Sequence, residues 1–344
     1  MSSETAAPQS PPYAEVASPA LECRALFVSH GRNSVLIDVN LTVDTGQTLA
    51  LLGPSGSGKT TLLHTVAGFL HPDAGEVLLD GRIVASPRAS VPPESRSAAM
   101  VFQNYALWPH LSALDNVAYP FRRSGLRKKA AREAAFALLD RLGAAALADR
   151  RPAELSGGQQ QRVGVARALA RRSRVTLLDE PTAHLDQALR AQVQEEIARV
   201  IRASGGAVVY ATHDAGEALA IADRVALLRS GRLLQVGTPR EIYENPCDLW
   251  AARLTGPAAA IRGPDRDAPW LVVRPEWTSL GGDLDGRVYD VRYRGAHTDY
   301  SLDTGLGRVV VRDDRPPMLA IGEQTSWSIR RSWALSKISD DDGA

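Results

Sequence analysis

The stretch Gly53-Pro-Ser-Gly-Ser-Gly-Lys-Thr-Thr61 fits the phosphate-loop pattern of a glycine, four residues and then Gly-Lys-Thr. The sequence predicts a short buried strand before it, over residues 47–52, and a helix after it, over residues 61–69. A strand that runs through a glycine loop into a helix aims several backbone N–H groups and the positive end of the helix dipole at one point, which favours an anion. We therefore expect a nucleotide-phosphate site with the Lys59 ammonium on the outer phosphates and the Thr60 hydroxyl on Mg²⁺. Its residues would be Gly53, Pro54, Ser55, Gly56, Ser57, Gly58, Lys59, Thr60 and Thr61.

Length and composition set broad limits on the architecture. The chain has 344 residues, 44% of them hydrophobic, which is enough for two or three domains with packed cores. The formal net charge of +1 gives no reason to expect nucleic acid or an anionic membrane surface as a partner. Cys23 and Cys247 lie far apart without metal-ligand spacing, and no apolar stretch approaches the roughly 18 residues of a membrane span. Work at a membrane would therefore require docking on an embedded partner.

Alternating polar and apolar segments divide the chain into regions. Residues 1–20 are rich in Pro, Ser and Ala and are predicted to form a disordered tail. Antiparallel strands are expected over residues 21–28, 34–43 and 75–81, around the phosphate loop. Buried parallel strands are expected over residues 174–179, 207–212 and 224–228, with helices over residues 187–204 and 215–222 between them. The pattern is that of an α/β domain over residues 21–248, with a mixed sheet and an antiparallel β subdomain.

Two further regions do not follow this alternation of strands and helices. A helical subdomain is expected at about 104–165, with helices broken by Pro120, Gly143 and Pro152. Its aromatic residues Tyr105, Trp108, Tyr119 and Phe121 are predicted to be exposed at a partner interface, although packing inside the subdomain is the equal alternative for each one. A linker over residues 249–263 is followed by short β segments, which predict a small OB-like β-domain over residues 264–344.

A second anion-binding helix start is predicted at Leu155-Ser-Gly-Gly-Gln159. Ser156 is a natural N-cap, and Gly157 and Gly158 would allow the backbone to approach an anion closely. With this segment, the chain resembles the ATPases of ABC transporters over residues 21 to about 250. The matching motifs are the phosphate loop (Walker A), the signature Leu155–Gln159, Walker B at Val175–Asp179 with Glu180, the Q-loop Gln103, the D-loop Ala183-His-Leu-Asp186 and the switch residue His213.

The resemblance implies a mechanism that requires two copies of the chain. ATP would bind between the Walker A loop of one subunit and Ser156, Gly157, Gly158 and Gln159 of the other, with Asp186 nearby. Asp179 would hold Mg²⁺ beside Thr60, Glu180 would act as the general base on the attacking water, and His213 would contact the γ-phosphate. Gln103 would sense both metal and water. ATP would join the dimer, and its hydrolysis would loosen it.

Some positions depart from the family pattern. The aromatic residue that usually stacks on adenine is replaced by His30, with Phe27 and Tyr13 nearby. An imidazole ring stacks on a base less strongly than a larger aromatic ring does. The D-loop begins with Ala183 where serine is common, and His184 is bulkier than the usual residue.

The C-terminal β segment, which opens with Val273-Arg-Pro-Glu276, is similar to the accessory domain of maltose, polyamine, sulfate or ferric-iron importer ATPases. The resemblance implies a homodimeric ATP-hydrolysing subunit of an ABC importer. It would lie peripherally on the cytoplasmic face of the membrane, bound to separate permease subunits and served by a solute-binding protein. The segment Tyr105–His110 is most similar to ferric-iron or polyamine importers. The alternatives are an exporter ATPase, a soluble ABC ATPase of DNA repair or translation, and a P-loop kinase.

Overall fold

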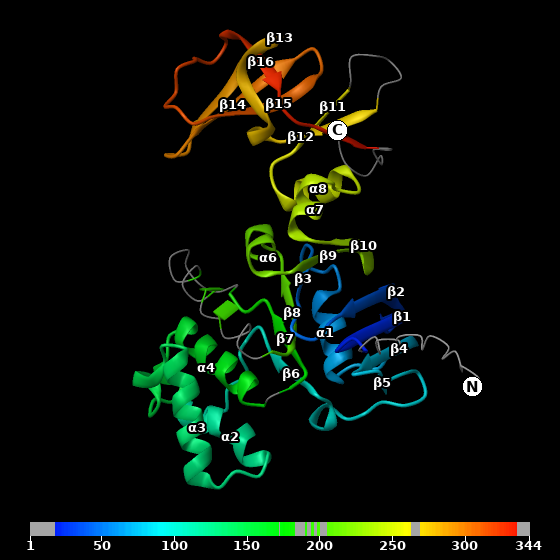
Figure 1. The fold of residues 1–344 in the computed structure, drawn as a ribbon, viewed down its shortest axis with the longest axis vertical. Coiled ribbons are helices and arrows are strands. Elements are labelled where there is room, and N and C mark those ends of the chain that lie inside the picture. The colour runs from blue at the N-terminus through cyan, green and yellow to red at the C-terminus, as the bar shows by residue number, and fades with distance from the viewer. Residues whose placement is uncertain are drawn as a thin grey trace, which may run out of the picture.

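The computed structural model describes residues 18–171, 173–182, 190, 194–195, 198–199, 205–262 and 269–335. A six-stranded sheet forms the centre of the larger domain (Figure 1). Its order is β10-β9-β3-β8-β7-β6, and all neighbouring pairs are parallel except β10 with β9. These strands are Arg232–Gly237, Arg224–Arg229, Thr48–Leu52, Ala207–Thr212, Val175–Asp179 and Ala98–Val101. β3, β8 and β7 are buried at every position, which explains their unbroken apolar sequences.

A second, antiparallel sheet packs beside the central one, in the order β2-β1-β4-β5. Its strands are Asn33–Val43, Leu21–His30, Ala74–Leu79 and Arg82–Ala85. One apolar core joins this sheet to the helix α1, Lys59–Ala67, and to the central strands. α1 therefore has its N-terminus fixed at the end of β3, where the phosphate loop lies.

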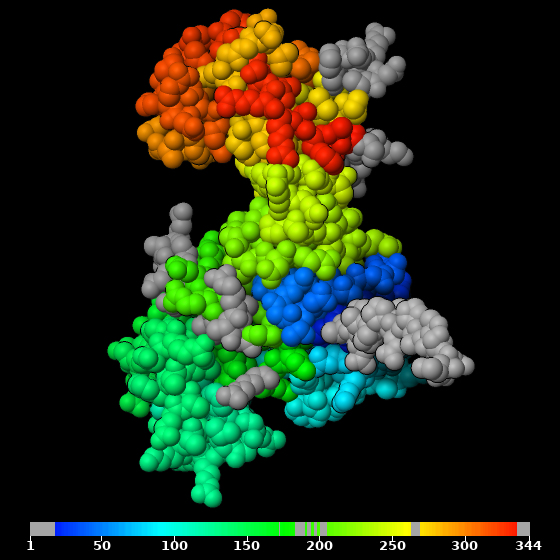
Figure 2. All heavy atoms as spheres, viewed as in Figure 1, coloured from blue at the N-terminus to red at the C-terminus, as the bar shows by residue number. Residues whose placement is uncertain are grey.

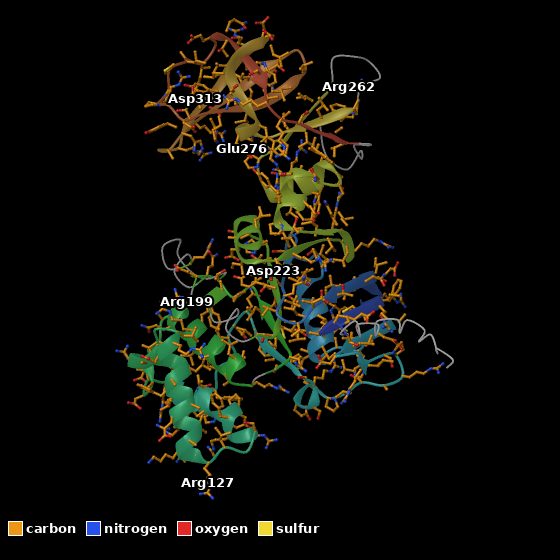
Figure 3. All side chains as sticks on the ribbon, in the orientation of Figure 1. Arg127, Arg199, Asp223, Arg262, Glu276 and Asp313 are labelled. Atoms are coloured by element: carbon orange, nitrogen blue, oxygen red, sulfur yellow. The ribbon has the colours of Figure 1, made fainter. Side chains whose placement is uncertain are left out.

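The helical region contains α2 (Ala113–Arg123), α3 (Lys128–Arg141) and α4 (Gly157–Ala170). Figure 3 labels Arg127 at its far tip, between α2 and α3. The prediction that Pro120 breaks a helix is wrong, because Pro120 lies inside α2. Only three residues of α2 follow it, and buried Val117 and Phe121 anchor the helix on either side. The lost backbone hydrogen bond is thus confined to the last turn.

The C-terminal domain is built from two antiparallel sheets, as expected for an OB-like β-domain. One has the order β11-β12-β17 and the other β15-β14-β13-β16. The strands are β11 Ala259–Arg262, β12 Trp270–Val273, β13 Thr278–Tyr293, β14 Thr298–Thr304, β15 Gly307–Asp313, β16 Gln324–Ile329 and β17 Trp333–Leu335. The predicted linker, residues 249–263, therefore includes a strand of this domain, since β11 pairs with β12.

A narrow waist connects the two domains, formed by α7 (Pro239–Glu244) and α8 (Leu249–Thr255) (Figure 2). Arg274 of the C-terminal domain is completely buried there. Its guanidinium donates hydrogen bonds to the carbonyls of Tyr243 and Ala252 and to the Thr255 hydroxyl, at 2.9–3.2 Å. It also stacks 3.8 Å from the centroid of the Tyr243 ring. One buried cation thus attaches the C-terminal domain to both waist helices.

Candidate nucleotide site

The phosphate loop follows β3 directly and continues into α1. A Cβ atom at Gly53 would lie 2.3 Å from the Leu228 carbonyl oxygen, so the loop can pass β9 only with glycine there. Gly58 has φ +107°, in the left-handed region that favours glycine, and it precedes the first turn of α1. The Ser57 hydroxyl is buried without a hydrogen-bond partner in the described part of the chain. A loop with such an orphaned donor fits a bound phosphate.

Lys59 turns its ammonium group back over the loop. The side chain is buried, and Nζ donates to the carbonyl oxygens of Gly53 at 2.8 Å and Pro54 at 3.1 Å. Nζ also lies 3.4 Å from Glu180 Oε1. The only cationic side chain of the loop is therefore held by three oxygen atoms, which a phosphate would have to replace.

Two oxygen ligands suited to a small cation meet beside the loop. Thr60 Oγ1 lies 3.2 Å from Asp179 Oδ1, and it is oriented to donate to this carboxylate. Burial raises the pKa of Asp179 above its ordinary value, although the hydrogen bond from Thr60 opposes the shift. A divalent cation would favour the ionised carboxylate. Hydroxyl and carboxylate oxygens are the ligands that Mg²⁺ accepts, so the pair fits the predicted metal site.

Glu180 follows the last residue of β7 in an uncommon conformation. Its φ of +44° lies in the left-handed region, which non-glycine residues adopt at a cost. Its backbone N–H donates to the Ala211 carbonyl on β8 at 3.0 Å, and this bond holds the turn. Glu180 Oε2 lies 3.2 Å from His213 Nδ1. The predicted base and the predicted switch histidine are therefore in direct contact.

These groups share one edge of the sheet because they follow neighbouring parallel strands. The phosphate loop follows β3, His213 follows β8, Glu180 follows β7 and Gln103 comes two residues after β6. Carboxyl ends of parallel strands form the usual ligand crevice of α/β sheets. Gln103 is exposed, and in the described part of the chain it makes no hydrogen bond to Thr60 or Asp179. Its roles in metal and water sensing stay predictions.

The predicted adenine-stacking residue lies next to the phosphate loop. His30, at the end of β1, is exposed, and its Nε2 is 3.4 Å from Thr61 Oγ1. An imidazole in this place can reach a nucleotide bound to the loop, although stacking itself stays a prediction. Phe27 is half-buried on the same strand, and Tyr13 lies outside the described residues.

The signature segment forms the capped start of α4, as predicted. The Ser156 hydroxyl accepts from the Gln159 backbone N–H at 3.4 Å, and Gln159 Oε1 accepts from the Ser156 N–H at 3.0 Å. A Cβ at Gly157 would meet no atom within 4 Å. None of the described hydrogen bonds joins this segment to the phosphate loop. Asp186 and the rest of the D-loop, with Ala183 and His184, lie outside the described residues.

The aromatic residues of the helical region separate into two groups. Tyr105 and Phe121 are buried in its own core, so their predicted exposure is wrong. Trp108 and Tyr119 instead line a cavity of about 640 Å³ between α2, α4, β6 and the end of α1. Their rings lie 4.7 Å apart, and Arg167 lies 4.9 Å from the centroid of the Trp108 ring. Helical periodicity could not separate the two groups. Tyr105 and Trp108 precede α2, and only Tyr119 and Phe121 lie in it.

One buried acidic residue beside this site was missed by the sequence analysis. Glu217, in helix α6 (Ala215–Ile221), is 5% exposed. It accepts hydrogen bonds from Thr182, two residues after Glu180, and from Thr212, directly before His213. The only sequence signal is an acid three residues after the N-cap Asp214, which ordinarily predicts a solvent-facing capping box.

Comparison with known proteins agrees with this geometry. The family model described as "ABC transporter" matches residues 36–183, and the model described as "TOBE domain" matches residues 271–334. An Fe(3+) ions import ATP-binding protein, FbpC of Agrobacterium fabrum, is 40% identical over 312 residues, which cover 82% of this chain and 87% of that protein. The spermidine/putrescine import ATP-binding protein PotA of Legionella pneumophila is 35% identical over 329 residues, 85% of this chain and 89% of that protein.

Solved structures resemble the larger domain. The cbiO1 protein of Clostridium perfringens, part of an ABC transporter complex, covers 65% of this chain and 90% of its own, with TM-score 0.59 and 28% identity. A dimeric ATP-binding cassette in a post-hydrolysis state with ADP and Pi covers 64% of this chain and 99% of its own, with TM-score 0.57 and 29% identity. The predicted fold class and the importer-type resemblance are confirmed. The chain belongs to the ATP-binding proteins of the ABC transporter family.

Proposed function

We propose that this protein is the ATP-hydrolysing subunit of an ABC importer, in which Glu180 acts as general base. The observation that carries the proposal is the meeting of Lys59, Thr60, Asp179, Glu180 and His213 at the carboxyl ends of three adjacent parallel strands. This arrangement combines a phosphate-binding loop, a pair of metal ligands and a carboxylate base within contact of one another. Phosphoryl transfer to water requires these three parts and little else.

Each residue has a separate task in the proposed reaction. The loop N–H groups and the Lys59 ammonium bind the phosphates, and Glu180 accepts a proton from the attacking water or polarises it. His213 orients Glu180 through the 3.2 Å contact and reaches the γ-phosphate. Thr60 and Asp179 would hold Mg²⁺, which supplies positive charge against the phosphate oxygens. Gln103 reports the state of the site to the helical region.

The site is proposed to be completed by a second copy of the chain in a head-to-tail homodimer. The start of α4 is a capped helix N-terminus with open space at Gly157, and it is not bonded to the phosphate loop of its own chain within the described residues. Ser156, Gly157, Gly158 and Gln159 of one subunit would cover the γ-phosphate bound by the other, with Asp186 at the interface. ATP then holds the two subunits together until it is hydrolysed.

Hydrolysis by the purified protein tests this assignment. Glu180→Gln keeps the shape of the side chain and removes its basicity, so turnover is expected to fall by roughly 10²-fold or more. ATP binding is expected to persist, and size-exclusion chromatography with ATP should show a stable dimer. Turnover near the wild-type rate would remove Glu180 from the role of base.

The permease is proposed to dock in the cavity lined by Trp108 and Tyr119, on the cytoplasmic face of the membrane. The cavity also contains Phe69, Phe102 and Arg123, so it offers aromatic surface together with positive charge to a short helix. Within the described residues, no helix is long and apolar enough to cross a membrane. A separate membrane subunit is part of the proposal because the chain is similar to import ATP-binding proteins.

Replacement of Trp108 by Glu tests the docking site. The variant is expected to keep its melting temperature and ATPase rate in isolation while losing the permease in a pull-down. Ala146→Glu in the same region, outside the cavity, is the matched control and should retain the permease. If Trp108→Glu retains the permease once folded, docking occurs elsewhere.

The proposed solute is Fe(3+), with polyamines as the second candidate. The support comes from the relatives, because Fe(3+) import proteins match this chain at about 40% identity and a spermidine/putrescine import protein at 35%. Cells in which the chromosomal copy carries Glu180→Gln should lose uptake of Fe(3+) but retain uptake of spermidine. The reverse outcome would assign the transporter to polyamines.

A further inference from the structure

Three helical starts in the described part of the chain use a Glu or Gln three residues after the N-cap in the ordinary way. Glu154, Gln159 and Glu241 each turn back to accept the backbone N–H of the N-cap residue. At Ser156 and Thr238 the N-cap hydroxyl also accepts from the third residue, which completes a capping box. α6 has the same sequence arrangement, with Asp214 as N-cap and Glu217 in the third position. The Glu217 side chain turns into the protein instead and is 5% exposed. It therefore performs some task other than capping.

Four hydrogen-bond donors surround the buried carboxylate, and each oxygen atom accepts two. Oε1 accepts from the Thr182 hydroxyl and from Gln194 Nε2, the latter at 2.6 Å. Oε2 accepts from the Thr212 hydroxyl at 2.7 Å and the Tyr210 hydroxyl at 3.3 Å. Within the described residues Glu217 has no cationic partner at ion-pair distance. Burial of an unpaired carboxylate is unfavourable, so these four bonds are what make its position tolerable.

Two of the four donors, Thr182 and Thr212, flank the proposed catalytic groups. Thr182 comes two residues after Glu180, and Thr212 comes directly before His213. The Thr212 hydroxyl also accepts the Asp214 backbone N–H at 3.0 Å, so it fixes the backbone on both sides of His213. One carboxylate thus binds the end of the Glu180 turn with one oxygen and the start of the His213 turn with the other.

Glu180 needs such support more than an ordinary residue does. Its φ of +44° is unfavourable for a side chain with a Cβ, so the turn persists only where the surrounding contacts hold it. The bond from its N–H to the Ala211 carbonyl holds the turn before the side chain, and the Thr182 bond to Glu217 holds it after. Loss of the second contact would allow Glu180 and His213 to drift apart.

We propose that Glu217 is a positioning residue for ATP hydrolysis. By accepting hydrogen bonds from both Thr182 and Thr212, it fixes the position of Glu180 relative to His213. The inference rests on the proposed roles of Glu180 and His213. Glu217 itself touches neither the nucleotide loop nor the two catalytic side chains in the described contacts. Its effect should therefore appear in kcat and not in the binding of ATP.

The test compares kcat, KM for ATP and melting temperature of the full-length protein and its variants. Glu217→Ala is expected to lower kcat roughly 10- to 100-fold with little change in KM. A small displacement of Glu180 or His213 from the reacting water or phosphate slows the reaction without weakening the binding of ATP. Glu217→Gln should restore most of the rate, because its carbonyl oxygen accepts from one pair of donors and its amide donates to hydroxyl oxygens of the other. The control Glu241→Gln, at the equivalent helix position of α7, should retain wild-type kcat.

A second variant distinguishes a positioning role of Glu217 from a loss of folding in Glu217→Ala. Thr212→Val keeps the shape of the side chain and removes one hydroxyl, so it should lower kcat in the same direction while the protein stays folded. In a His213→Ala background, Glu217→Ala is expected to lower kcat by a smaller factor than in the wild type, because one of the two groups that it positions is already absent. A fully additive further loss would contradict the proposed route through His213.

The outcomes separate this inference from the proposed function. If Glu180→Gln abolishes turnover while Glu217→Ala and Thr212→Val retain the wild-type kcat per folded molecule, Glu217 is only structural and the inference is wrong. If Glu180→Gln retains turnover, the proposed role of Glu180 as general base is wrong, whatever the Glu217 variants show. A fall in kcat at constant KM, together with rescue by Glu217→Gln, supports the positioning role.

Discussion

The contact between Lys59 and Glu180 predicts that the carboxylate of Glu180, the proposed general base, competes with nucleotide for the lysine. Lys59 Nζ lies 3.4 Å from Glu180 Oε1, and the two side chains are 4% and 16% exposed. A phosphate can take the ammonium group only after this contact is weakened. Glu180→Gln removes the charge but keeps the size of the side chain, so the variant should bind nucleotide more tightly even though it no longer hydrolyses ATP.

The size of the effect follows from the geometry. An ion pair between exposed side chains contributes about 0.2–1 kcal/mol. This pair is largely buried, so the 3.4 Å contact is expected to contribute about 1–1.5 kcal/mol. Because about 1.4 kcal/mol corresponds to a tenfold change in an equilibrium constant, affinity should rise roughly tenfold. Removal of a negative charge near the phosphates acts in the same direction, and added salt should reduce the gain because Glu180 is not fully buried.

Isothermal titration with ADP is the suitable assay. ADP has no γ-phosphate to join two subunits, so a higher affinity reports the Lys59 contact and not dimer formation. His213→Ala is the control, because it removes the other partner of Glu180 and leaves the Lys59 contact in place. It should lower kcat without tightening ADP binding. If Glu180→Gln binds ADP no more tightly than the wild type, the lysine is not held back by Glu180 and the reasoning is refuted.

Three other variants test separate parts of the structure. Ser156→Arg should abolish ATPase activity while ADP affinity of the monomer, measured by titration, is unchanged; loss of that affinity would place Ser156 in its own chain's pocket. His30→Tyr should tighten ATP binding because a larger ring stacks over more area, whereas an unchanged Kd would assign the base to another residue. Arg274→Ala should give a separate calorimetric transition for the C-terminal domain at a lower temperature. The variant leaves the Tyr243 and Ala252 carbonyls without their donor, and each unsatisfied carbonyl lowers the free energy of unfolding by about 1–3 kcal/mol. A single unshifted transition would contradict this role of Arg274.

The nucleotide site was predictable from sequence because its parts are local. Each of its motifs is a strand end followed by a few polar residues, as at β3 with Lys59 and at β7 with Glu180. Apolar runs identify such buried strands, and the parallel arrangement then brings their carboxyl ends together. The capped start of α4 was predictable for the same reason, since Ser156 and Gln159 satisfy each other within one turn.

The features that sequence could not give depend on long-range packing. Tyr105 and Phe121 face the core while Tyr119 faces solvent, which depends on how α2 lies on α4. Glu217 has the local pattern of a capping residue, and the donors Thr182 and Gln194, from distant parts of the chain, help to turn it inward. Local sequence reports the preference of a segment, whereas burial of a polar group is decided by donors that are far away along the chain.

The glycines of the two anion-binding segments differ in a way that argues for a shared site. Gly53 is required by its own chain, because a Cβ would meet the Leu228 carbonyl oxygen at 2.3 Å. Gly157 is not required by its own chain, because a Cβ there would meet no described atom within 4 Å. Glycine in a helix is otherwise less favourable than alanine. The described part of the folded monomer therefore gives no steric reason for glycine at residue 157. A close approach from outside the chain supplies one, and a phosphate held by the loop of a second subunit is the group that a capped helix N-terminus would accept.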